Sequence, residues 1–216
     1  MDEQNRLIIT EQEPTPAIDS QEMVISTSLD ESGRTQSGLI GKNQPASVCL
    51  YPNDQLRVKT EPVVNFDQEL TNLIELMANT LYTNKAIGLA ANQIGVNKSV
   101  FLIDCVVRGK TDLRIFVNPQ ITKMEGEVKE IEGCLSFPGC TTLVKRARAV
   151  EGKAQDQSGK EFKFAFDGSV AIAVQHECDH LNGILMIDHI SSLCKRFLKK
   201  KLAKVKKRII QTHFLP

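Results

Sequence analysis

The segment from Val170 to Val174, with the sequence VAIAV, is apolar on almost every side of a helix, and it constrains the fold most. Asp167 or Ser169 can cap the start of this helix, and Gly183 is a natural stop at its end. A helix that is hydrophobic all round is stable only where other elements cover it. We therefore expect the chain to fold around a buried helix.

The second half of the same helix reads HECDH, with His176 and His180 four residues apart. Residues at this spacing lie one turn apart on one helix face, so both imidazoles can bind one cation. Glu177 is rotated by about 100° from His176 and can reach a water molecule on that cation. The five-residue pattern also occurs by chance on surface helices. Burial favours a metal site, because buried imidazoles and carboxylates need partners.

A catalytic metal needs a third protein ligand besides a helical histidine pair. The two downstream histidines, His189 and His213, lack the spacing of a metallopeptidase ligand. Cys134 is the better candidate, because it follows Gly133 in EIEGCLSFPGC and glycine lets a backbone approach closely. A Cys-His-His site with an open position would result. Taken alone, Cys134 is more typical of a buried thiol in a loop.

The remaining segments predict helices and strands without βαβ alternation. Helical spacing predicts a helix over 65–82, with Asn65 and Gln68 as a capping box. A basic amphipathic helix is expected over 191–210, with an apolar stripe of Leu193, Phe197, Leu198, Leu202, Val205 and Ile209. Strands are expected at 47–52, 99–107 and 114–119, within 141–156, and over 160–166. These elements predict an α+β fold, with mixed or antiparallel sheets around the buried helix.

Length and charge indicate one domain with an extension at each end. The chain has 216 residues, of which 41% are hydrophobic and 25% charged, as in soluble globular proteins. Residues 1–46 hold eight acids and three bases, and we expect a flexible extension, or a short docked strand at RLIIT. The folded body is expected over 47–190. Residues 191–216 hold nine Lys or Arg and no acid, which indicates a polyanionic partner.

No segment approaches the roughly 18 uncharged apolar residues of a membrane span. The acidic N-terminus does not resemble a secretory or organelle signal, so we expect a cytoplasmic protein that does not bind membranes. Six cysteines in such a protein are expected to be reduced thiols. Cys49 and Cys105 lie among apolar neighbours and are expected to be buried.

Three segments in register, AIGLAANQ (86–93), EGCLS (132–136) and QHECDHLNG (175–183), resemble the signature motifs of peptide deformylases. The resemblance covers about 47–190 and implies removal of the formyl group from formyl-methionyl nascent chains, with release of formate. It implies one divalent metal ion, expected to be Fe²⁺ with Zn²⁺, Ni²⁺ or Co²⁺ as alternatives. The implied site residues are metal ligands Cys134, His176 and His180, the general acid/base Glu177, and oxyanion donors Gln93 (side-chain amide) and Leu135 (backbone N–H).

The resemblance also suggests substrate contacts and one departure. Expected substrate-binding residues are Ile87, Gly88, Gly133, Ile172 and Ala173, although ordinary core packing explains the apolar ones equally well. Ala86 stands where the family usually has glycine, which would affect substrate preference if that position needed positive φ. Asp179 is expected to pair with Arg146 and brace the metal site.

Partners and rival functions follow from the same features. The resemblance suggests that the basic helix docks on ribosomal RNA; the alternative is an ordinary solvated amphipathic helix. One rival function is another HExxH metallopeptidase, which would generally lack a thiolate ligand such as Cys134. The other rival is a ribosome-binding domain with a structural metal, which would need neither Glu177 nor Gln93.

Overall fold

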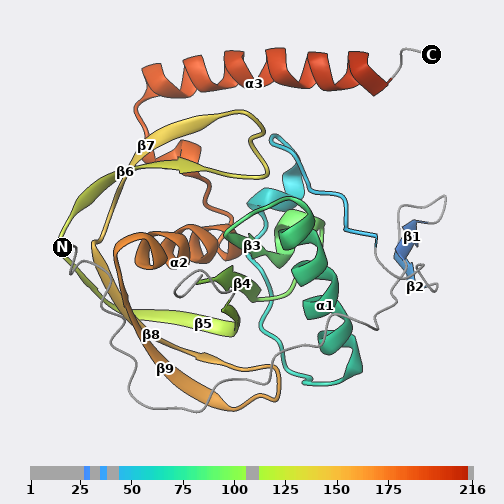
Figure 1. Ribbon diagram of the computed structural model, residues 1–216, viewed down its shortest axis with the longest axis vertical. Coiled ribbons are helices and arrows are strands. Elements are labelled where there is room, and N and C mark those ends of the chain that lie inside the picture. The colour runs from blue at the N-terminus through green and yellow to red at the C-terminus, as the bar shows by residue number, and fades with distance from the viewer. Residues whose placement is uncertain (1–26, 30–34, 38–43, 106–111, 214–216) are drawn as a thin grey trace.

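The computed structural model describes residues 27–29, 35–37, 44–105 and 112–213. Helix α2 (Gly168–Leu181) lies between a larger sheet and a two-stranded hairpin (Figure 1). Helix α1 (Gln68–Thr83) packs beside strands β3 (Gly88–Ala90) and β4 (Val100–Asp104), and helix α3 (Ser192–His213) runs along the outside of the hairpin. The strand considered at RLIIT lies outside the described residues. None of the described helices combines the length and apolar character needed to cross a membrane.

Both sheets of the body are antiparallel. The larger sheet has the order β3-β4-β5-β8-β9, with strands β3 Gly88–Ala90, β4 Val100–Asp104, β5 Leu113–Glu125, β8 Ala149–Gln155 and β9 Glu161–Asp167. The hairpin consists of β6 Val128–Gly133 and β7 Thr141–Arg146. In the extension, β1 Thr27–Leu29 pairs with β2 Thr35–Ser37. Three helices with antiparallel sheets confirm the predicted α+β class.

Helix α2, Gly168–Leu181, contacts β3, β4, β8 and β9. Ala171, Val174 and Leu181 pack in one cluster with the sheet residues Phe101, Phe116, Phe164 and Phe166. Asp167 occupies the N-cap position, and Gly183 follows the helix with φ +71°. A Cβ at Gly183 would lie 2.3 Å from the backbone oxygen of Arg57, so the chain can pass there only with glycine.

Helix α1, Gln68–Thr83, packs its apolar face on β3 and β4. The predicted capping box of Asn65 and Gln68 is wrong, because Asp67 is the N-cap. Its Oδ1 accepts hydrogen bonds from the backbone N–H groups of Glu69 at 3.0 Å and Leu70 at 3.2 Å. A carboxylate at this position satisfies two free donors and complements the helix dipole, which the Asn65 amide two residues earlier does not.

Helix α3, Ser192–His213, packs through Leu198 and Leu202 on the hairpin loop residues Phe137 and Cys140 and on Val144. The predicted apolar stripe is only partly correct, because Leu193 and Phe197 are 54% and 62% exposed. A helix that rests on a narrow hairpin buries fewer apolar positions than one that rests on a sheet. Of the remaining predicted positions, Val205 is half-buried, and the side chain of Ile209 is outside the described part.

Two predicted strands differ from the structure. Residues 47–52 form no strand; instead Cys49 N–H donates to Gln93 O at 2.7 Å, and Tyr51 N–H donates to Ser136 O at 3.0 Å. Cys49 and Cys105 are half-buried rather than buried.

Strand β5 continues through Pro119 to Glu125, beyond the predicted end. A register shift between Val117 and Gln120 and a positive φ of 51° at Asn118 accommodate the proline.

Candidate metal centre

Cys134, His176 and His180 meet although they are far apart in the sequence. Cys134 follows the last residue of β6, and both histidines project from α2. Their ligand atoms all lie within 4.8 Å of one another, with Cys134 Sγ 3.2 Å from His180 Nε2. The imidazole centroids are 4.9 Å apart. Within the described residues, this is the group of His, Cys, Asp or Glu side chains that could hold a metal ion.

Glu132 orients His176. Its Oε2 lies 2.8 Å from His176 Nδ1, which leaves Nε2 directed toward the cysteine and the second histidine. Arg146 donates to the same carboxylate from Nε at 2.7 Å and from Nη2 at 3.1 Å. Burial alone would raise the pKa of Glu132, but His176 and Arg146 outweigh it and lower the pKa to about 2. Glu132 is therefore a carboxylate that fixes the ring from behind.

The predicted pair of Arg146 and Asp179 is confirmed, with Nη1 donating to Oδ2 at 2.5 Å. Burial would raise the pKa of Asp179, but contacts with His189 and Arg146 hold it below its usual value. Arg146 thus links β7 to the carboxylate behind His176 and to the outer side of α2.

The burial of the two histidines and of Glu177 fits a bound cation. Within the described residues, Glu177 Oε2 is one of the buried side-chain atoms without a hydrogen-bond partner. Burial lowers the pKa of His180, which favours the neutral ring that binds metals. Burial also lowers the pKa of His176, but Cys134 and Glu132 outweigh it and raise the pKa, so this position favours positive charge. A thiolate and two imidazoles are suitable ligands for Zn²⁺ or Fe²⁺.

Glu177 lies beside the ligand cluster, against the edge strand β3. It is 4% exposed, and burial raises the pKa of its carboxyl group to about 7. A Cβ at Gly88 would lie only 2.4 Å from Glu177 Oε1. Gly88 therefore provides the space that the carboxylate occupies, a role that the sequence did not suggest.

Gln93 reaches the cluster from the 3₁₀ helix η2, Ala91–Ile94. Its Oε1 accepts from Ala90 N–H at 2.9 Å, which turns Nε2 toward Cys134 Sγ at 3.4 Å and Ser136 Oγ at 3.3 Å. Leu135 follows Cys134 directly. Its half-buried side chain packs against the hydrophobic cluster between α1 and the sheet, called the α1 cluster, which includes Leu70, Ile74 and Met77. The amide donor of Gln93 is thus held at the ligand cluster.

Sequence reasoning assigned no role to Glu132 and none to Asn92. Asn92 is 2% exposed, and its Nδ2 donates to the backbone oxygen of His180 at 2.5 Å, which ties η2 to α2. Both residues lie inside the recognised motifs, AIGLAANQ and EGCLS. This position could have indicated their roles, because a buried polar side chain needs a hydrogen-bond partner.

The predicted substrate-binding residues differ in their exposure to solvent. Ile87 is 63% exposed, while Ile172 and Ala173 are half-buried on α2, and Gly133 ends β6. Their contact with substrate stays a prediction. In the loop before β3, Lys85 has the positive φ of 53°, whereas Ala86 is not among the positive-φ residues and packs against the α1 cluster. Alanine is therefore unstrained at position 86.

A thiolate and two imidazoles beside a buried glutamate are typical of a mononuclear metallohydrolase. Residues 45–196 match the family model for polypeptide deformylase, so the chain belongs to the polypeptide deformylase family. A peptide deformylase from Chromobacterium violaceum is 40% identical over 162 residues, which cover 75% of this chain and 96% of the relative.

Solved structures agree with this family. The crystal structure of a peptide deformylase from Legionella pneumophila has 38% identity and a TM-score of 0.75, covering 80% of this chain and 100% of that one. Peptide deformylase 1B from Arabidopsis thaliana, in complex with an inhibitor, has 32% identity and a TM-score of 0.70, covering 79% and 95%.

Proposed function

We propose that this chain is a metal-dependent peptide deformylase. It removes the formyl group from the N-terminal formyl-methionine of nascent polypeptides and releases formate. The convergence of Cys134, His176 and His180 beside a buried Glu177 supports this function most directly, together with membership of the family.

Cys134, His176 and His180 would hold one divalent metal ion. When bound, such an ion polarises a carbonyl oxygen and lowers the pKa of a coordinated water to near 7. Glu177 accepts a proton from the attacking water and later donates it to the amine nitrogen that leaves. Its buried position suits both steps, because a raised pKa lets the carboxyl group exist in either form near neutral pH.

The formyl carbonyl would gain negative charge as water attacks. Gln93 donates to that oxygen through Nε2, and Leu135 donates through its backbone N–H. The fixed direction of the Gln93 amide supports this role. The proposed contacts with the methionyl part of the substrate come from Ile87, Gly88, Gly133, Ile172 and Ala173.

Fe²⁺ is the proposed natural metal, on family resemblance, and a thiolate–ferrous centre would be sensitive to oxygen. Imidazole and thiolate also suit Zn²⁺, Ni²⁺ and Co²⁺, so the ligand set alone does not select the metal.

Formate release from formyl-Met-Ala-Ser by anaerobically prepared protein tests the function. Wild-type protein should release formate and leave internal peptide bonds intact. The Glu177→Ala variant should keep its metal and lose at least about 10²-fold in kcat, because general acid–base catalysis contributes that much or more. Cleavage of internal bonds without formate release would show a different metallopeptidase.

We infer that the basic face of α3 docks on ribosomal RNA, which places the enzyme at nascent chains in the cytoplasm. Lys200, Lys204 and Lys207 are exposed, while Leu198 and Leu202 anchor the helix to the body. Deleting α3 would therefore also uncover core residues, and charge reversal is the cleaner test.

The triple change of Lys200, Lys204 and Lys207 to Glu should abolish salt-sensitive co-sedimentation with ribosomes. The matched control reverses three exposed lysines elsewhere, Lys129, Lys160 and Lys163. Equal binding by both triple variants would contradict docking through α3.

A further inference from the structure

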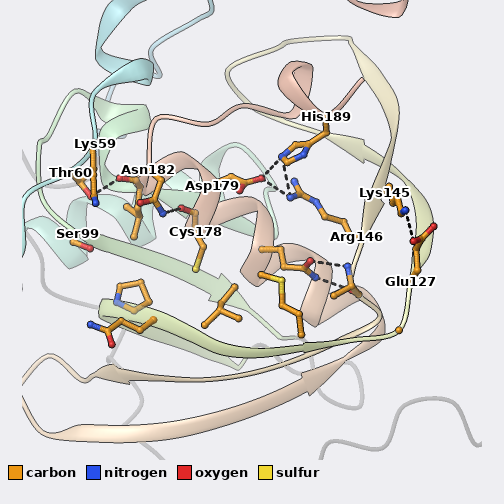
Figure 2. A pocket seen from close by; sticks show the side chains of 18 of the residues that line it. Lys59, Thr60, Ser99, Glu127, Lys145, Arg146, Cys178, Asp179, Asn182 and His189 are labelled. Atoms are coloured by element: carbon orange, nitrogen blue, oxygen red, sulfur yellow. Dashed lines mark hydrogen bonds and ion pairs between the residues drawn. The ribbon is translucent and has the colours of Figure 1, made fainter. Parts of the chain in front are cut away.

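A chain of polar side chains runs from the ligand cluster to the far side of α2. It passes from His176 through Glu132 and Arg146 to Asp179, with successive contacts of 2.8, 2.7 and 2.5 Å. His189, the last residue of the 3₁₀ helix η3 (Met186–His189), is the outermost member. Figure 2 shows Arg146, Asp179 and His189 converging at a pocket of about 1140 Å³ that none of the three metal-ligand candidates lines.

The contacts of His189 have a defined direction. Its Nε2 lies 2.6 Å from Asp179 Oδ2 and 3.4 Å from Arg146 Nη1. Arginine can only donate and an ionised carboxylate can only accept, so the imidazole donates from Nε2 to Asp179. Asp179 Oδ2 therefore receives two donors, one from each neighbour.

Arg146, Asp179 and His189 all line the pocket, and the imidazole occupies one side of this oxygen there. The side chains of Arg146 and Glu132 are 4% and 5% exposed, that of Asp179 is 19% exposed and that of His189 is 30% exposed. Without the imidazole, water in the pocket would compete for Asp179 and weaken its hold on Arg146. Arg146 is shared with Glu132, so a looser Arg146 leaves the carboxylate behind His176 less fixed.

We propose that His189 is a positioning residue for the metal centre. It fixes Asp179 and Arg146, and through them the Glu132 carboxylate that orients the His176 ring. This inference rests on the proposed metal site, but it concerns a residue outside the three recognised motifs and more than one contact away from the metal.

The test uses full-length protein loaded with Co²⁺, whose visible spectrum reports ligand geometry. Transfer of Co²⁺ to excess EDTA is followed for wild type, His189→Ala and His189→Gln. His189→Ala should release Co²⁺ about three- to tenfold faster, since partners directly behind a ligand are worth 10- to 100-fold and this one is further away. Its ligand-field bands should shift, whereas glutamine keeps an N–H donor near the Nε2 position and should restore both properties.

Glu127→Gln is the matched control. Glu127 lines the same pocket and pairs with Lys145, outside the polar chain. It should leave the release rate and the spectrum unchanged. An unchanged rate and spectrum in His189→Ala, or equal acceleration in Glu127→Gln, would overturn the role of His189. A wild-type spectrum without a thiolate-to-cobalt band would overturn the metal centre, and this inference with it.

Discussion

At the scale of single residues, the position of the Glu177 carboxylate depends on the absence of a side chain at Gly88. The carboxylate fills the space where a Cβ at position 88 would stand, and it is too buried to turn away freely. Any side chain at position 88 must therefore displace the proposed general acid/base. A glycine in a motif can thus be required because a neighbouring side chain needs the space, and not only because a substrate does.

Gly88→Ala should lower kcat by about 10²-fold, because displacement of a catalytic group by about 1 Å has that effect. Metal content should stay at the wild-type level, since the three atoms nearest the new methyl group all belong to Glu177. Formate release and metal analysis on the same sample check this prediction. Wild-type activity in the alanine variant would show that Glu177 has room to move.

At this scale the sequence predicted that Cys134, His176 and His180 lie together and that Arg146 pairs with Asp179. It did not predict Glu132 behind His176, because the two lie on β6 and α2 and no local spacing relates them. Helix periodicity relates His176 to His180, but only the packing of a hairpin against a helix brings Glu132 to the ring.

Among the elements, β6, β7 and α2 meet at the Arg146 side chain. Arg146 ends β7, pairs with Glu132 on β6 and pairs with Asp179 on α2. The two carboxylates therefore share one guanidinium, and each has a histidine as its second partner.

Arg146→Ala should lower the free energy of unfolding by about 3–5 kcal/mol, because it removes the buried guanidinium that two carboxylates share. It should also speed metal loss, which dialysis against a chelator measures. Arg148→Ala removes an exposed arginine two residues away and should change stability by no more than about 0.5 kcal/mol. Equal effects of both substitutions would contradict the bracing role.

Asp188 joins η3 to the 3₁₀ helix η1, Asp54–Arg57, through Arg57. Burial would raise the pKa of Asp188, but Arg57 and the Leu185 N–H hold it below its usual value. A depressed folded-state pKa stabilises the fold above the unfolded pKa of about 3.9, and this is lost as pH falls through the folded pKa. Asp188→Asn should therefore lower Tm at pH 7, and its difference from wild type should shrink as pH falls below about 4 and vanish below the folded-state pKa. A constant difference across this range would contradict the assignment.

The elements were predicted in type more reliably than in extent. Hydrophobic periodicity located α1, α2 and α3, because each buries one face or more. It ended β5 too early, since a proline within a strand is accommodated by a bulge that the sequence pattern does not reveal.

At the scale of the whole molecule, the buried side chains of the described residues form three clusters within residues 56–202. The earliest described contacts of the body are made by Ala46, whose N–H donates to Thr80 Oγ1 at 2.8 Å, and by Cys49. Ala46 lies just inside the predicted extension, so these contacts put the start of the body close to the predicted boundary but not at it. The division into an extension over 1–46, a catalytic body over 47–190 and a basic C-terminal part over 191–216 stays a proposal.

Removal of residues 1–43 should change Tm by no more than a few degrees and kcat/KM by no more than about twofold. The truncated protein keeps the hydrogen bonds that Ala46 and Cys49 make with the body. Removal of residues 1–49 should lower Tm, since it deletes the hydrogen bonds of Ala46 and Cys49 to Thr80 and Gln93. Thermal unfolding and formate release of both truncated proteins check this. A large loss in the shorter truncation would place the extension within the folded body.

X-ray absorption by Zn²⁺-loaded protein tests the ligand set most directly. We predict one zinc per chain, with one sulfur neighbour at about 2.3 Å and two imidazole nitrogens at about 2.0–2.1 Å. Cys134→Ser should remove the sulfur shell and keep both nitrogens. A wild-type spectrum without sulfur, or a sulfur shell that survives Cys134→Ser, would contradict the Cys-His-His centre on which the proposed catalysis depends.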